Sequence, residues 1–308
     1  SYSNINIYCI YQYPEECYGI ALSFPKTIRF NIKPYSNLSE LKVELYEDSS
    51  FENSWLLCVT ITDKDKKSIF SYLCENIIQT ILKESSIKSA VTSFANTLIK
   101  WKNLFEKTHS TCLSKEEQQG LYGELCLLQK FLSDSKDSLY TIVNYYVGTD
   151  KSLRDFQGKD WAVEVKTTST NNPQFLLING ERQLDDSMID NLFLFHCSVE
   201  VSKSSGETLP ERVKEIKDML SSDLAALSLF NAKLFEGGYL DTQEGQYSEH
   251  HYKLRKETFY HVTNDFPRIR ENELRSGVGN VHYGITISDC EPYVVSEESV
   301  TNTTINHD

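Results

Sequence analysis

The sequence of 308 residues lacks several features of membrane and secreted proteins. No positively charged leader followed by an apolar run opens it, and no uninterrupted apolar stretch approaches the roughly 20 residues that span a bilayer. Its eight cysteines form no CxxC pair and no regular spacing, which is typical of reduced thiols rather than of a disulfide framework. We therefore expect a soluble, cytoplasmic protein with no membrane partner.

Basic residues are outnumbered by acidic residues, 31 to 44, and the net charge is −13. This balance argues against a generic polyanion-binding protein, which usually carries surplus lysine and arginine. It leaves room for a local basic cleft, and a metal-dependent nuclease needs acidic residues at its centre. The sequence also has no glycine-rich phosphate loop, helicase motif, Ser-His-Asp order, internal repeat or low-complexity linker. With 40% hydrophobic residues the chain can bury a substantial core, and its length suggests two domains.

The first part of the chain has the alternating pattern of β-strands, broken by turns that contain proline, asparagine and serine. Apolar residues alternate over four stretches, 5–9, 18–24, 28–32 and 41–45. We expect an antiparallel module of five or six strands up to about residue 65. Apolar residues at helical spacing then predict helices over 68–83 and 87–107.

A third helix is predicted from a capping box, with Ser114 at the N-cap and Glu117 three residues later. Glu124 lies at the edge of its leucine stripe, where a charge is costly unless it is paired or bound to metal. Gly120 and Gly123 each weaken the helix by about 1 kcal/mol relative to alanine. Such a pair indicates close approach of another backbone.

The remaining patterns predict a mixed α/β core, with helices packed against the sheet. We expect strands over 139–147, 174–178, 191–201, 252–262 and 281–288, and one or two helices over 209–235. The expected organisation is a β-rich module ending in a helix, a core domain and a polar, frayed tail, over 1–83, 84–295 and 296–308 respectively.

The chemistry centres on a hairpin. Alternation of Trp161, Val163 and Val165 predicts a strand with one apolar face, which leaves Glu164 and Lys166 together on the opposite face. A Gln-Gly-Lys-Asp turn precedes this strand.

Asp155 comes before that turn, and antiparallel pairing would return it to the side of Glu164. Two carboxylates and a lysine suit a hard divalent cation such as Mg²⁺, with the Val165 carbonyl as a third ligand and Mn²⁺ as a substitute. Lys166 would orient water or steady phosphate charge. Phosphodiester hydrolysis is the reaction that such a site favours.

These residues resemble the PD-(D/E)XK nuclease superfamily, whose members include restriction endonucleases. The resemblance implies a restriction-endonuclease-like core, a mixed sheet flanked by helices, and a further catalytic glutamate from the preceding helix, here Glu124. It narrows to a bacterial group of PD-(D/E)XK motif proteins linked to phage defence. Motifs similar to that group lie at 120–125, 154–156, 164–168, 182–184, 266–269 and 277–278. They cover roughly residues 110–290, and the layout extends the likeness to the whole chain.

Three positions leave alternatives open. Arg154 stands where the superfamily's name has proline, although that proline is often absent. Asp160 rivals Asp155 as the first carboxylate, but its place four residues before Glu164 also suits a turn, and we favour Asp155. Gln183 can contact DNA or the water network, or can simply be a solvated residue after a turn.

Basic residues late in the chain are candidate DNA contacts: Lys253, Arg255, Arg268 and Arg270. Solvated charge on strand edges explains them equally well. A zinc site at His250 and His251 is disfavoured, because adjacent residues of an extended segment point to opposite faces.

The residues predict a Mg²⁺-dependent DNA endonuclease, and the resemblance implies that it acts in an anti-phage defence or restriction system. We expect a homodimer with possible defence partners, whose N-terminal module supplies dimer, partner or target contacts. The first alternative is a catalytically inactive nuclease-fold subunit that binds within a larger defence complex. An RNA nuclease is a further alternative.

Overall fold

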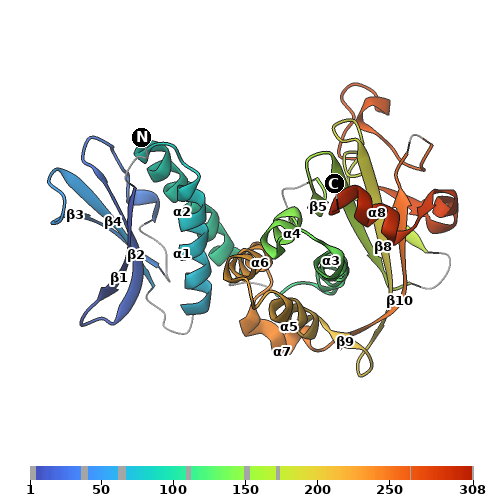
Figure 1. Ribbon diagram of the computed structural model, residues 1–308, viewed down its shortest axis with the longest axis horizontal. Coiled ribbons are helices and arrows are strands. Elements are labelled where there is room, and N and C mark those ends of the chain that lie inside the picture. The colour runs from blue at the N-terminus through green and yellow to red at the C-terminus, as the bar shows by residue number, and fades with distance from the viewer. Residues whose placement is uncertain are drawn as a thin grey trace. The chain divides into compact units, whose positions relative to one another are not determined.

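The structure is a computed structural model, and it describes residues 5–35, 41–61, 67–108, 112–148, 153–170, 174–263 and 265–306 (Figure 1). Contacts divide the chain into two compact units, Ser1–Thr111 and Cys112–Asp308. Among the described residues, none of the helices combines the length and the apolar character needed to cross a membrane.

The first unit holds an antiparallel four-stranded sheet, in the order β1-β2-β4-β3, and two helices (Figure 1). Its elements are β1 (Asn6–Gln12), β2 (Cys17–Pro25), η1 (Lys33–Tyr35), β3 (Leu41–Glu47), β4 (Ser54–Ile61), α1 (Lys67–Leu82) and α2 (Ile87–Thr108). The antiparallel class is confirmed, but the predicted strand over 28–32 is wrong. Those residues form a bend followed by irregular backbone, where the Phe30 ring stacks on Tyr35 with centroids 5.7 Å apart. Because α1 and α2 pack together, α2 lies in this unit, whereas the sequence placed the division after residue 83.

The second unit holds a mixed sheet in the order β12-β10-β8-β6-β5, with β9 also paired to β10. β6 and β8 run parallel, and the other neighbours run antiparallel. In chain order, the second unit begins with α3 (Lys115–Asp134), α4 (Leu139–Tyr145), β5 (Phe156–Gln157), β6 (Trp161–Thr168), β7 (Phe175–Ile178), β8 (Asn191–Ser202), β9 (Glu207–Thr208), α5 (Leu209–Met219) and α6 (Leu224–Glu236). The rest are η3 (Asp241–Gln243), α7 (Glu244–Tyr247), β10 (His251–His261), η4 (Glu271–Glu273), β11 (Tyr283–Thr286), η5 (Ile287–Tyr293), β12 (Val294–Val295) and α8 (Glu297–Thr304).

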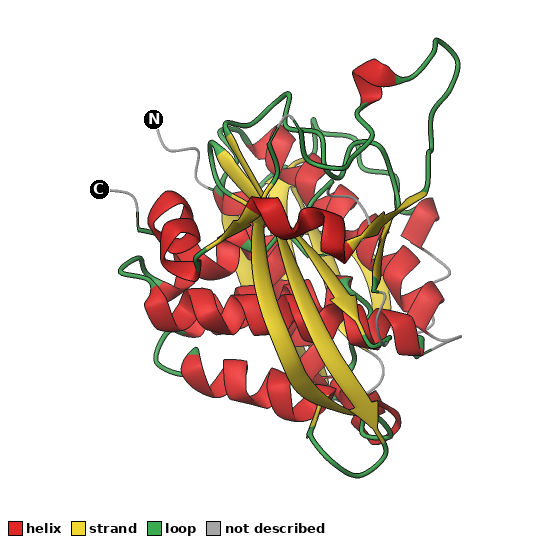
Figure 2. Ribbon diagram, turned by 90° about the vertical axis from the view of Figure 1, so that its right-hand side faces the viewer, coloured by secondary structure: helices red, strands yellow, loops and turns green. Residues whose placement is uncertain are grey.

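The two faces of the mixed sheet are covered differently. Trp161, Val163 and Val165 of β6 belong to a core shared with helices α3 to α6, which gather on one side of β8 and β10 (Figure 1). Ala162 belongs to a second core with residues of β7, β11 and η5. In Figure 2 the long strands lie in front of most of the helices, and one helical segment crosses in front of the strands. The alternation read from the sequence is therefore confirmed, and a mixed sheet flanked by helices agrees with the restriction-endonuclease-like core.

In the second unit, three predicted elements differ from the structure. Residues 139–145 form the helix α4 rather than a strand, because Ser138 caps it and Ile142 and Val143 are buried on its inner side. β7 does not extend the main sheet but pairs with β11 in a two-stranded sheet. The expected frayed tail contains α8, which Ser296 caps and the fully buried Val300 anchors.

The start of α3 is as predicted. The Ser114 hydroxyl accepts from the Glu117 N–H at 3.2 Å, and the Glu117 carboxylate accepts from the Ser114 N–H at 2.7 Å. This capping box fixes where the helix begins, and thereby which of its residues face the sheet.

Candidate active site

The hairpin of β5 and β6 brings the first two carboxylates together. Phe156 pairs with Val163 and Gln157 with Ala162, so the same register sets Asp155 opposite Glu164. Asp155 Oδ2 accepts a hydrogen bond of 2.7 Å from the Val165 N–H. The structure thus places Asp155 beside the strand that carries Glu164, as the sequence pattern predicts.

Glu164 and Lys166 form an ion pair on β6, with Lys166 Nζ 2.8 Å from Glu164 Oε1. The Glu164 side chain is only 3% exposed, so the pair lies largely out of water. Lys166 Nζ also donates to Gln183 Oε1 at 3.1 Å, and the Asn179 N–H donates to the same oxygen at 2.9 Å. Gln183 therefore holds the lysine from the turn after β7.

Glu124 reaches the site from α3, which approaches β6 closely at Gly123. A Cβ on Gly123 would lie 1.9 Å from Thr167 Oγ1, whereas a Cβ on Gly120 would meet nothing within 4 Å. The close approach inferred from the two glycines is therefore found at Gly123 and not at Gly120. The group that approaches Gly123 is the Thr167 side chain of β6 rather than another backbone. Glu124 Oε2 accepts from the Tyr146 hydroxyl at 2.8 Å.

The three carboxylates form one electrostatic group. Burial, and then the charge of Asp155, raise the pKa of Glu164 to about 8, while Lys166 and Arg154 oppose that rise. Burial, followed by Asp155, also raises the pKa of Glu124 well above its ordinary value. Burial raises the pKa of Asp155, against the lowering effect of the Val165 N–H. Perturbed carboxylates that share one site are a feature of functional centres.

Two observations bear on a cation. Glu164 Oε2 is buried and has no hydrogen-bond partner among the described residues. The Val165 C=O points to the same side of β6 as its N–H, which faces Asp155, because a strand residue presents both groups to one neighbour. The part of the chain that the structure describes contains no group of three or more His, Cys, Asp or Glu side chains arranged to hold a metal. Asp155, Glu164 and the Val165 carbonyl nevertheless fit Mg²⁺, which takes one or two carboxylates and keeps several waters.

The rival Asp160 lies at the start of β6, four residues from Glu164, which is about 13 Å along a strand. Its carbonyl accepts from the Asp190 and Asn191 N–H groups at 3.0 Å each, so its backbone closes a turn. Asp155, rather than Asp160, is the carboxylate that raises the pKa of Glu164. The geometry therefore favours Asp155 as the first carboxylate.

The candidate nucleic-acid contacts fall into two groups. Gln183 lines a surface depression of about 370 Å³ together with Leu153, Asn179, Gly180, Glu181, Arg182 and Asn280. Lys253 and Arg255 are exposed on β10, where a bulge interrupts the pairing with β8. These residues are accessible to a ligand.

Two of the predicted arginines are engaged within the protein instead. The Arg268 side chain is 1% exposed, donating to the Leu184 carbonyl at 2.6 Å and to Asp186 at 2.7 Å. Arg270 pairs with Glu273 at 2.9 Å. Arg268 is therefore a buried structural residue rather than a surface phosphate contact, because its guanidinium closes the turn after β7.

Sequence reasoning missed several supporting residues. Tyr146 went unnoticed because it fell in an expected strand, and only the helix α4 sets its hydroxyl against Glu124. Arg154 is 6% exposed and donates to the Asp185 carbonyl. In the sequence Arg154 stood out only at the proline position, and its place next to Asp155 was the one signal for a supporting role. Gln119 donates to the Thr167 carbonyl at 2.9 Å, and its place one turn before Gly123 was its only hint.

Comparison with known proteins agrees with this geometry. No curated protein and no solved structure matches the chain. A family model described as "Putative PD-(D/E)XK family member (DUF4420)" matches residues 1–288, nearly the whole sequence. The chain therefore belongs to the PD-(D/E)XK family DUF4420.

Proposed function

We propose that this protein is a Mg²⁺-dependent endonuclease that hydrolyses phosphodiester bonds of DNA. One observation carries the proposal: buried Glu164 pairs with Lys166 through Oε1, has no partner for Oε2 among the described residues, and lies beside Asp155. A buried carboxylate with an open oxygen next to a second carboxylate is costly unless a cation joins it.

Asp155, Glu164 and the Val165 carbonyl would hold the cation, and Mn²⁺ would replace Mg²⁺ at such oxygen ligands. When bound, the ion supplies polarisation of a phosphoryl oxygen and a water of lowered pKa. The Val165 N–H keeps Asp155 oriented toward that position.

Lys166 and Glu124 have roles beside the ligands. The Lys166 ammonium, held by Gln183, is positioned to orient the attacking water or to offset negative charge on the phosphate. The raised pKa of Glu124, caused first by burial, suits its Oε2 to accept a proton from water, and the Tyr146 hydroxyl orients that carboxylate.

We further propose that DNA lies across Gln183 and across the exposed Lys253 and Arg255. The positive charges of Lys253 and Arg255 would offset the acidity of the chain near the site.

Cutting both strands suits a homodimer, and the first unit would supply dimer, partner or target contacts. All eight cysteines are free thiols, which supports a reducing, cytoplasmic compartment. The motifs by which the sequence resembles a defence-linked group of PD-(D/E)XK proteins support a role in anti-phage defence or restriction.

A plasmid cleavage assay tests the proposal, using modified and unmodified DNA with and without Mg²⁺, and RNA in parallel. Asp155→Asn, Glu164→Gln and Lys166→Ala should each abolish cleavage, whereas Asp160→Asn should retain it. Full activity of Glu164→Gln would refute the site. Digestion of RNA but not DNA would assign the same chemistry to the other nucleic acid.

The alternative of a binding subunit that does not cut predicts a different result. Titration calorimetry with Mn²⁺ should show binding that is lost in Glu164→Gln if the site is catalytic. DNA binding without Mn²⁺ binding and without cleavage would favour the inactive subunit.

A further inference from the structure

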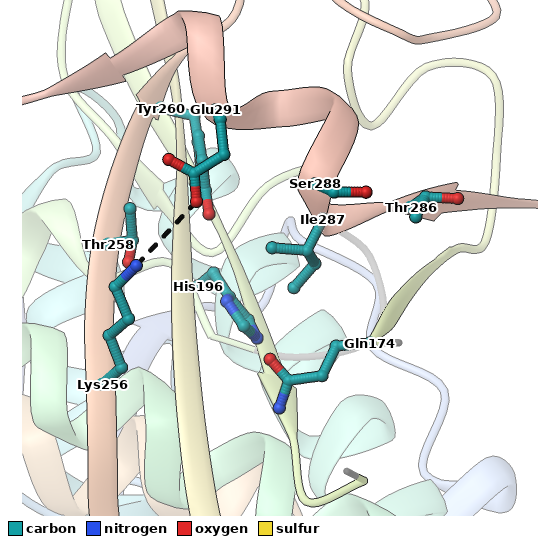
Figure 3. A pocket seen from close by; sticks show the side chains of 9 residues that line it. All are labelled: Gln174, His196, Lys256, Thr258, Tyr260, Thr286, Ile287, Ser288 and Glu291. Carbon is teal, nitrogen blue, oxygen red and sulfur yellow. Dashed lines mark ion pairs between the residues drawn. The ribbon is translucent and has the colours of Figure 1, made fainter. Parts of the chain in front are cut away.

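A second polar cavity, of about 560 Å³, lies beside the catalytic strand (Figure 3). Its floor is made by side chains from β8 and β10, of which His196 is 2%, Thr258 7% and Tyr260 1% exposed. Its rim includes exposed residues, Lys256, Ser288 and Glu291. Gln174, Thr286 and Ile287 complete the lining, and Figure 3 shows Gln174 and His196 side by side.

The floor continues the rows of side chains that contain the catalytic residues. Lys166 on β6 pairs with His196 on β8, which pairs with Thr258 on β10. Partners in register project from the same face of a sheet, and neighbouring strands are about 4.8 Å apart. His196 therefore lies about 5 Å, and Thr258 about 10 Å, across the sheet from Lys166.

The floor offers hydrogen-bonding groups without a fixed charge. Burial, and then Lys256, lower the pKa of His196 to about 4, so the imidazole is neutral near pH 7. Its Nε2 lies 2.8 Å from Thr168 Oγ1. The Gln174 amide is oriented by donating to Ser198 Oγ at 2.8 Å. Neutral amide, imidazole and hydroxyl groups match the edge of a nucleobase better than a phosphate or carboxylate.

The walls and the rim also suit a planar base attached to a charged backbone. Ile287, which is partly exposed, provides apolar surface for a ring to pack on, next to the buried Tyr260 of the floor. Lys256 and Glu291 are 4.0 Å apart across the rim, and both side chains are more than half exposed. Such an exposed pair is weak and easily opened. Lys256 can then contact a phosphate, as can Arg255 next to it.

We propose that this cavity receives one unstacked nucleobase of the strand whose phosphate lies at Lys166. This inference rests on the proposed function, because it takes the catalytic site to hold nucleic acid. A separation of about 10 Å corresponds to at most roughly three nucleotides, because 3.4 Å is the rise per stacked step and an unstacked strand is longer per nucleotide. The cavity thus gives the enzyme a means to read one base near the cut, at the cost of a few kcal/mol to unstack it.

Photocrosslinking of the full chain tests the proposal. Randomised duplex and single-stranded oligonucleotides would carry 5-iodouracil in place of thymine, or 8-azidoadenine in place of adenine. The adduct should map by mass spectrometry to His196 or Tyr260. Ser288→Trp, which fills the cavity from its exposed rim, should reduce that adduct at least tenfold, whereas Asp289→Trp, on the neighbouring exposed residue, should not.

The outcomes separate this inference from the proposed function. Cleavage without a floor adduct, or an adduct unaffected by Ser288→Trp, would overturn the base site and leave the nuclease standing. A Ser288-dependent adduct without cleavage would support the base site and refute the nuclease. The same photoreactive bases supplied as free mononucleotides are the second arm. An equal adduct yield from them at equal concentration would assign the cavity to free nucleotides and overturn the strand-bound base.

Discussion

The Val165 N–H donates to Asp155 Oδ2 at 2.7 Å, which ties the first carboxylate to the residue between Glu164 and Lys166. Asp155→Asn removes the charge but keeps an oxygen that can accept this bond, whereas Asp155→Ala removes both. We predict that each variant loses cleavage activity by at least about 100-fold. Asp155→Ala should also be less stable than Asp155→Asn by about 1 kcal/mol. Chemical denaturation of both variants measures this difference, and equal stabilities would show that the bond contributes nothing.

The stability of the metal-free protein should fall with rising pH because of Glu164. Burial, and then Asp155, raise its folded-state pKa to about 8 from an ordinary value of 4.5. The folded state therefore binds the proton more tightly than the unfolded chain does, so this stabilisation is complete below about pH 4.5 and is lost as pH rises through about 8. Glu164→Gln should consequently unfold several degrees above the wild type at pH 9, with a smaller gap at pH 5.

Thermal unfolding in chelator across this pH range measures the effect, with the exposed Glu200→Gln as a control that should not change the profile. Adding Mg²⁺ at pH 8.5 should raise the midpoint of the wild type and leave that of Glu164→Gln unchanged. A wild type whose midpoint rises steadily with pH in chelator would contradict the assignment.

Gly123 and Gly120 form a matched pair on α3. Gly123→Ala places a Cβ 1.9 Å from Thr167 Oγ1, so Thr167 must rotate or the helix must withdraw. We predict a loss of about 1–3 kcal/mol from this overpacking, together with reduced cleavage, because Glu124 is the next residue. Gly120→Ala meets nothing within 4 Å and should gain about 1 kcal/mol of stability.

A double variant that combines Gly123→Ala with Thr167→Ala checks this explanation. Removing Oγ1 should restore part of the stability, although Thr167 Cβ would still lie 3.1 Å from the new methyl group. If Gly123→Ala were as stable and active as Gly120→Ala, the close approach of α3 to β6 would have no functional importance.

Tyr146→Phe should shift the pH dependence of cleavage toward higher pH. The Tyr146 hydroxyl donates to Glu124 Oε2 at 2.8 Å and so lowers the pKa of that carboxyl against the larger effect of burial. Without it Glu124 loses its proton only at higher pH, so activity should fall severalfold near pH 7 and recover toward pH 9. Tyr145→Phe is the control, because that ring packs on Trp161 rather than on Glu124. If the pH profiles of cleavage shifted equally in the two variants, the Tyr146 hydroxyl would have no specific role in setting the pKa of Glu124.

The hairpin and the α3 cap were predictable because both depend on local spacing. Two-residue alternation sets Glu164 and Lys166 on one face, and a capping box sets the start of α3, whatever surrounds them. Residues 139–145 were mispredicted, since their β-branched residues favour a strand while burial of Ile142 and Val143 selects a helix.

Side-chain partners from distant segments could not be read from the sequence. Gln183 meets Lys166 across 17 positions, and Tyr146 meets Glu124 across 22, only because the tertiary fold joins their elements. Arg268 shows the opposite case, since a charge that suggests a surface contact is in fact buried against Asp186. Pattern alone gives the face of a residue but not its partner.

The short length of β5 has a consequence for association. It pairs with only Ala162 and Val163, so the rest of β6 would present open backbone groups to any other strand. Asp155 occupies the Val165 N–H, and Gln119 occupies the Thr167 carbonyl. These two side chains thus occupy part of the edge that β5 leaves uncovered. We therefore expect the hydrogen bonds that hold the candidate site together also to hinder edge-to-edge pairing with another sheet.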